Sequence, residues 1–110
     1  MLTTKKTGAD FIVFLRGRID NHEGKSLEID LIRFIEENNK CNLIISLKDV
    51  EYLSSSGIRI FLSTQRLLKE NGFQLKLCEL QPAVTKLLQA AKIIDYLDIS
   101  ETLEDAINSL

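Results

Sequence analysis

Residues 49–62 read DVEYLSSSGIRIFL, and this stretch decides the fold because a strand pattern gives way there to a helix pattern. Upstream, Asn42–Leu47 is a short apolar run rich in isoleucine and leucine, as in a buried strand. Downstream, mostly apolar side chains recur at helical spacing, at Ile58, Phe61, Leu62, Gln65 and Leu68. The pattern predicts that Ser54–Gly57 lies at the N-terminus of a helix.

A helix start suits an anion. Its first backbone N–H groups are unpaired and carry roughly half a positive charge, which attracts groups such as phosphate. A serine in this position is therefore able to carry a phosphoryl group. Serine is also a favoured N-cap, and Ser-Ser-Gly is ordinary loop chemistry. The residues alone leave both a phosphorylation site and a plain cap open.

Composition predicts one soluble domain spanning residues 1–110, with 45% hydrophobic and 27% charged residues. The 14 basic and 16 acidic residues give a net charge of −2, which favours neither nucleic acid nor an acidic membrane as a partner. No apolar run approaches the length needed to cross a bilayer, and Met1–Lys6 lacks the apolar segment of a secretory signal. We therefore expect a cytoplasmic protein.

The usual catalytic patterns are missing from the sequence. There is no phosphate-binding glycine loop and no plausible Ser-His-Asp set around the single histidine, His22, which we expect in a loop or a first helical turn. Cys41 and Cys78 are too few and too far apart for a zinc motif, and we expect both to be reduced and buried. The sequence therefore predicts no enzyme, no metal and no cofactor.

The first half of the chain predicts two strands and a helix. Leu2–Thr7 and Phe11–Arg16 are the strands, and the second is apolar at both odd and even positions, as in a strand buried on both faces. A polar break at Gly17–His22 precedes a helix over Glu23–Asn38. Asp20 or Asn21 is expected to cap this helix, and Asn38-Asn39 to end it.

The second half continues as alternating helices and strands. The helix after the serines should end near Asn71-Gly72, followed by a strand at Phe73–Cys78 and a helix that begins at Pro82. A minor strand at Tyr96–Ile99 and a last helix capped by Ser100 complete the chain. The prediction is an α/β fold with a mixed four- to five-stranded sheet and about four α-helices, with the first two strands antiparallel.

Three motifs make the chain resemble the STAS domain family, and within it the single-domain bacterial anti-sigma factor antagonists. Leu15–Asp20, LRGRID, looks like that family's Gly-x-hydrophobic-Asp signature. The strand Asn42–Leu47 is followed by Asp49–Leu53, and then by Ser54–Ile58, where family members typically read Asp-Ser-Ser-Gly-Leu. The resemblance runs along the whole chain.

The resemblance implies a switch. The unmodified protein would bind an anti-sigma factor that is also an ATP-dependent serine kinase, and phosphorylation of the serine before the glycine would end the binding. That serine is Ser56, with Ser55 as the second choice. Ser54 stands where many members have aspartate, so it can cap the helix but carries no charge. A dianionic group at a binding helix can undo an interface by repulsion and desolvation.

The predicted partner surface combines the stretch Ser54–Gly57 with the residues that precede the helix at Glu23–Asn38. It comprises Asp20, Asn21, Ser54, Ser55, Ser56, Gly57, Arg59 and Ile60. Ile60 and Leu67 are seven residues apart and nearly opposite the predicted core face, which suggests two exposed aliphatic contacts. The alternatives are isolated surface apolar residues or a second helix that covers them. Arg59 is predicted to pair with a phosphorylated Ser56 or with an acidic group on the partner.

Two other functions stay open from the sequence. One is a STAS scaffold that is never phosphorylated, either within a larger stress-signalling assembly or as the soluble subunit of a lipid transporter. The other is a small nucleotide-binding domain that uses the same helix start for the ligand's phosphate. We expect a monomer or weak dimer that binds no nucleic acid directly and no membrane.

Overall fold

A five-stranded mixed sheet forms the centre of the computed structural model, which describes residues 2–38 and 41–110. Its strands lie in chain order: β1 (Leu2–Thr7), β2 (Asp10–Ile19), β3 (Leu43–Leu53), β4 (Leu75–Cys78) and β5 (Ile99–Ser100). β1 and β2 form an antiparallel hairpin, and the remaining neighbours pair in parallel. The predicted α/β class and mixed sheet are confirmed.

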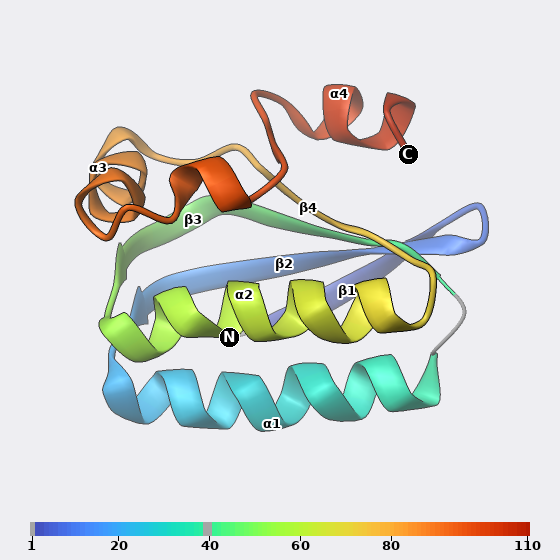
Figure 1. Cartoon of the computed structure of the whole chain (residues 1–110), viewed down its shortest axis with the longest axis horizontal. Coiled ribbons are helices and arrows are strands. Elements are labelled where there is room, and N and C mark those ends of the chain that lie inside the picture. Colours follow the sequence, from blue (N-terminus) through green and yellow to red (C-terminus); the bar gives the residue numbers. More distant parts are fainter. Residues whose placement is uncertain (1, 39–40) are drawn as a thin grey trace.

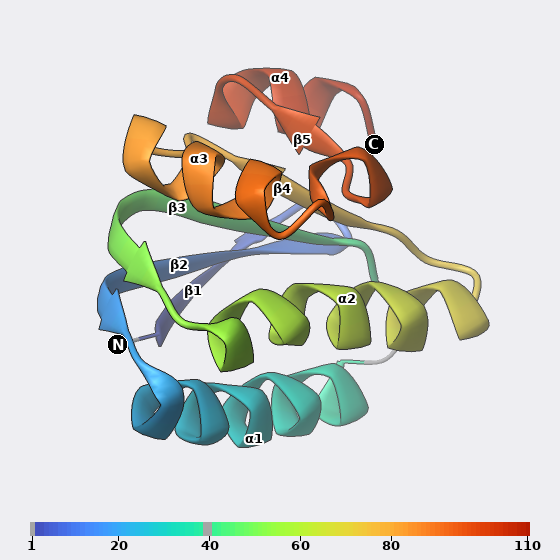
Figure 2. The same cartoon turned by 60° about the vertical axis from the view of Figure 1, so that its left-hand side comes forward.

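Helices cover both faces of this sheet. They are α1 (Asn21–Glu37), α2 (Ser55–Glu70), α3 (Pro82–Ala90), the short 3₁₀ helix η1 (Ile94–Tyr96) and α4 (Leu103–Asn108). Helices α1 and α2 lie side by side on one face, and α4 lies on the other (Figures 1 and 2). None of the helices in the described ranges is long and apolar enough to span a membrane.

Side chains that alternate along the strands build two cores. Val13 of β2 and Ile45 of β3 face α1 and α2 in the larger core, which also receives Val84 of α3. Their neighbours Ile12 and Ile44 face the opposite way and pack with Ala106 of α4 in the smaller core. The prediction that β2 is a strand buried on both faces is confirmed.

The predicted break at Gly17–His22 is wrong in its first half, because β2 continues to Ile19 and α1 begins at Asn21. The pairing of β2 with β3 shifts register on both sides of Arg16-Gly17, and Gly17 adopts φ +94°. Such irregularities bend a strand without ending it, so polar residues that resemble a loop are accommodated within the sheet. As a result, Ile19 pairs with Leu53, and β2 and β3 end side by side.

Other boundaries differ by a few residues. β3 continues through Lys48–Leu53, and Tyr96 belongs to η1 instead of a strand. The last helix is capped by Thr102, whose hydroxyl accepts from the backbone N–H of Asp105 at 3.1 Å, so Ser100 as its cap is wrong. Asn38 does end α1, as predicted, whereas Asn39 lies outside the described residues.

Both cysteines are free and buried, as predicted. Burial raises the pKa of the Cys78 thiol to about 12, with a further increase from the Glu79 carboxylate and a partial decrease from a hydrogen bond with Ser46. Burial also raises the pKa of Cys41. Since the thiolate is the reactive species, neither cysteine is set up for redox chemistry.

We predict that the folded protein resists thiol labelling at about pH 8, since protonated buried thiols react slowly. Labelling with a maleimide should become complete only as urea unfolds the chain. The Cys78 contribution to stability is present below the unfolded pKa of roughly 8.5 and is lost as the pH rises toward about 12. Rapid labelling of the native protein would contradict the prediction that both thiols are protected. Fluorescence measured in the same samples reports the fraction of folded protein.

Candidate functional site

Two helix starts meet where β2 and β3 end. The carboxylate of Asp20 accepts from the backbone N–H of Glu23 at 2.8 Å and caps α1. The hydroxyl of Ser54 accepts from the backbone N–H of Gly57 at 3.2 Å and caps α2. The backbone N–H of Ser54 also donates to the carbonyl of Ile19 at 2.8 Å. The two caps are therefore held next to each other, and the predicted helix start at the serines is confirmed.

Glycines let α1 pack closely against α2, and α2 closely against the end of β2. A Cβ atom on Gly24 would lie 3.1 Å from Cβ of Ser56, and one on Gly57 would lie 3.2 Å from Cγ2 of Ile19. Both distances are shorter than ordinary carbon contacts. Gly24 was not among the predicted site residues, although a glycine one turn inside a helix indicates that another segment packs there.

The three serines have different environments. Ser54 is buried by its capping role, with 7% of its surface exposed, and Ser55 is exposed. Ser56 is half-buried, and its hydroxyl donates to Oδ1 of Asn21 at 3.0 Å. Only Ser56 is thus both accessible and in contact with α1.

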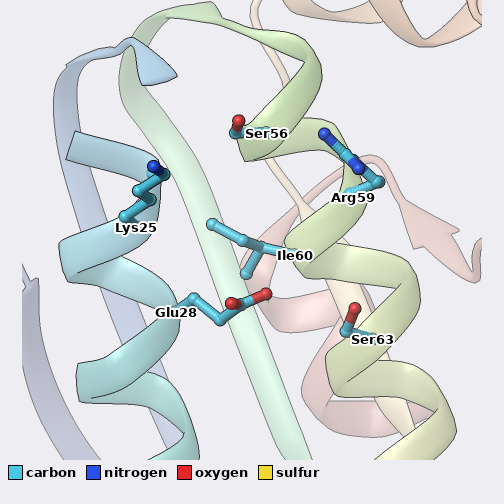
Figure 3. Close-up of a pocket in the computed structure, with 7 residues that line it drawn as sticks. Lys25, Glu28, Ser56, Arg59, Ile60 and Ser63 are labelled. Carbon is cyan, nitrogen blue, oxygen red and sulfur yellow. The ribbon is translucent and has the colours of Figure 1, made fainter. Parts of the chain in front are cut away.

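A cavity of about 320 Å³ opens beside Ser56 between the two helices. We call it the serine pocket; its lining residues are Gly24, Lys25, Glu28, Ser56, Arg59, Ile60 and Ser63. Figure 3 shows Lys25 and Glu28 projecting from α1, and Ser56 and Arg59 from α2. The pocket therefore carries two positive charges and one negative charge around a serine.

The expectation that Ile60 is an exposed contact is wrong. Its side chain is 1% exposed because it lies between α1 and α2, where it lines the serine pocket together with residues of α1 (Figure 3). Leu67 is half-buried and lines a second cavity between elements α1 and α2. The alternative that another helix covers these residues is the correct one. Among the described residues, the exposed large apolar side chains are instead Ile29, Ile32 and Tyr96.

The structure otherwise brings the predicted partner residues together at one end of the α1–α2 pair. Asp20, Asn21, Ser55 and Arg59 are exposed there, whereas Gly57 is buried beneath them. His22 lies exposed in the first turn of α1, as predicted. Within residues 2–38 and 41–110, no group of three or more His, Cys, Asp or Glu side chains is placed to hold a metal ion.

The chain matches the STAS domain over residues 1–106, which is nearly its whole length. It belongs to the STAS domain family. This STAS domain is similar to the anti-sigma-B factor antagonist of Bacillus subtilis (strain 168), with 31% identity over 103 residues that cover 94% of this chain and 93% of the relative. The family resemblance in the sequence is confirmed.

Solved STAS structures have the same fold. An anti-sigma factor antagonist domain protein from Planctomyces limnophilus gives a TM-score of 0.87 at 17% identity, covering 98% of this chain and 96% of that one. The antagonist SpoIIAA in its unphosphorylated form gives 0.82 at 19% identity, covering 99% and 95%. The Bacillus cell fate determinant SpoIIAA in its phosphorylated form gives 0.73 at 18%, covering 99% and 98%. At these identities, the likeness shows the fold of this STAS domain.

Proposed function

We propose that this STAS domain is an anti-sigma factor antagonist that binds an anti-sigma factor with serine kinase activity and is released when Ser56 is phosphorylated. Support comes from family membership and from a relative named as an anti-sigma-B factor antagonist at 31% identity. The observation that carries the proposal is the position of Ser56, half-exposed in the first turn of α2 beside the start of α1.

The local chemistry favours Ser56 over its neighbours as the acceptor. Ser54 uses its hydroxyl to cap α2, so modification there would remove the cap. Ser55 is exposed and remains the second choice. Beside Ser56, the first backbone N–H groups of α2 lack intrahelical partners and favour negative charge. In the proposed step, the γ-phosphoryl group of ATP moves to Oγ of Ser56, its bond to the β–γ bridging oxygen breaks to release ADP, and a base of the kinase takes up the hydroxyl proton.

The proposed binding surface follows from exposure. Asp20, Asn21, Ser55, Ser56 and Arg59 are available for direct contacts at the paired helix starts. The remaining members of the predicted set shape this surface from below, since they are buried: Ser54, Gly57 and Ile60. We propose a cytoplasmic binding protein without catalytic activity that acts as a monomer or weak dimer.

The test is to incubate the protein with ATP and its cognate anti-sigma kinase and to locate phosphate by mass spectrometry. We predict a single phosphate on Ser56. Ser56→Ala should abolish incorporation, and the matched Ser55→Ala should retain it. Phosphate at another residue would refute the assignment of Ser56. Tight binding of the anti-sigma factor without any phosphorylation would instead favour an unphosphorylated scaffold.

A further inference from the structure

We infer that Lys25 of α1 and Arg59 of α2 hold the phosphoryl group of phosphorylated Ser56, so that the modification fastens the two helices together. The inference rests on the proposed function, because it concerns the state of the protein after Ser56 is modified. It assigns to the serine pocket a role that neither helix could fulfil alone.

The serine pocket places Ser56 in one cavity with two basic side chains. Lys25, Ser56 and Arg59 line one cavity of about 320 Å³, and the two basic residues come from different helices. In the view of Figure 3, Ser56 lies at the top of the pocket between these two side chains. A Cβ atom on Gly24 would lie 3.1 Å from Cβ of Ser56, and Oγ of Ser56 donates to Oδ1 of Asn21 at the start of α1, so a group added to Oγ lies beside α1.

The charged side chains of the serine pocket favour an added anion. Lys25 and Arg59 are exposed, and the ion pair found among the described residues joins two others, Lys76 and Asp98, at 2.8 Å. Both basic groups are therefore free to turn toward a new anion. Glu28 is the acidic residue that lines the pocket, so the unmodified pocket carries a positive excess. A phosphoserine with a charge of roughly −1.5 to −2 would compensate it.

The hydrogen bond between Ser56 and Asn21 must change when Ser56 is phosphorylated. The unmodified hydroxyl donates to Oδ1 of Asn21 at 3.0 Å. A phosphate ester on Oγ has no proton to donate, so this bond is lost on modification. Rotation of the Asn21 side-chain amide would present its N–H₂ group to the phosphate instead. A third donor, also from α1, then faces the same anion.

Phosphorylation would thereby act on the partner surface twice. It adds negative charge at the start of α2, and it draws the exposed Arg59 side chain away from the partner. The phosphorylated protein is also expected to be more stable than the unmodified one, because the phosphate joins α1 to α2. This stabilisation separates the inference from simple repulsion at an interface.

The test installs phosphoserine at position 56 by genetic encoding, which requires no kinase. The phosphorylated protein should melt about 4 °C higher than the unmodified one, and the second pKa of its phosphate, followed by ³¹P NMR, should fall by about one unit from its usual value near 6. Lys25→Ala and Arg59→Ala should each remove at least about half of both shifts. Both residues are exposed, so these variants should fold normally.

Arg66→Ala is the matched control, since Arg66 is an exposed arginine two turns further along α2 and does not line the serine pocket. It should leave both shifts intact. A lower melting temperature on phosphorylation, an unchanged phosphate pKa, or shifts that survive both pocket substitutions would overturn the inference. Failure of the kinase to modify Ser56 would count against the proposed function alone, because this measurement does not use it.

Discussion

Ser56→Asp should weaken binding to the anti-sigma factor at least about thirtyfold. The substitution places a carboxylate in the first turn of α2, on the surface that the partner is proposed to cover. The partner must then bury that carboxylate, and it loses Arg59, which turns toward the new charge; burying a charge that the partner does not match typically costs about 2–5 kcal/mol. Isothermal titration calorimetry with the purified anti-sigma factor measures the change directly. Ser56→Ala, which adds no charge, should bind within about threefold of the unmodified protein.

A control for added charge is Ser109→Asp, because Ser109 follows α4 on the opposite face of the sheet. It should leave affinity within about threefold, since exposed charges that are far apart are screened by salt. Melting temperatures of both aspartate variants confirm that they are folded. If Ser56→Asp binds as tightly as Ser109→Asp, the first turn of α2 is not the partner surface.

Ile60→Ala should lower the free energy of unfolding by about 2–5 kcal/mol, the range for truncating a buried isoleucine. Ile60 is 1% exposed and fills the space between α2 and α1 beneath the serine pocket. Loss of its outer carbons leaves a cavity that neighbouring side chains fill only in part. Urea denaturation followed by circular dichroism measures the change.

The matched control is Ile29→Ala, since Ile29 is 57% exposed on α1. Its substitution is expected to change stability by no more than about 0.5 kcal/mol. Both variants replace isoleucine with alanine within a helix, so the difference in helix propensity largely cancels between them. Equal effects of the two substitutions would mean that α1 does not cover α2 as the structure shows.

The sequence predicted features that depend on local patterns. Two-sided apolar character placed β2 inside the sheet, and the serines before a helical stripe placed the start of α2. The burial of Ile60 was missed because α2 packs in two directions at once. Phe61 is fully buried in the larger core, and Ile60, about 100° around the helix, lines the serine pocket beside α1. One row of apolar residues at helical spacing does not reveal that two helices lie side by side on one face of the sheet.

The extension of β2 was missed for a related reason. Arg16, Gly17 and Arg18 resemble a loop when only neighbouring residues are considered. They stay in the sheet because β3 continues alongside them as far as Leu53, which is information from a distant part of the chain. The serine pocket was likewise unpredictable, because its lining residues come from two helices separated by a strand.

The hydrogen bond between Ser56 and Asn21 joins residues that are 35 positions apart. The backbone bond from Ser54 to Ile19 spans a similar stretch of chain at the same place. Neither bond can form until these distant segments have come together in the folded chain. The proposed partner surface is thus complete only after β2 and β3 have paired. A kinase or partner that binds this surface would therefore distinguish the folded protein from an unfolded chain of the same sequence.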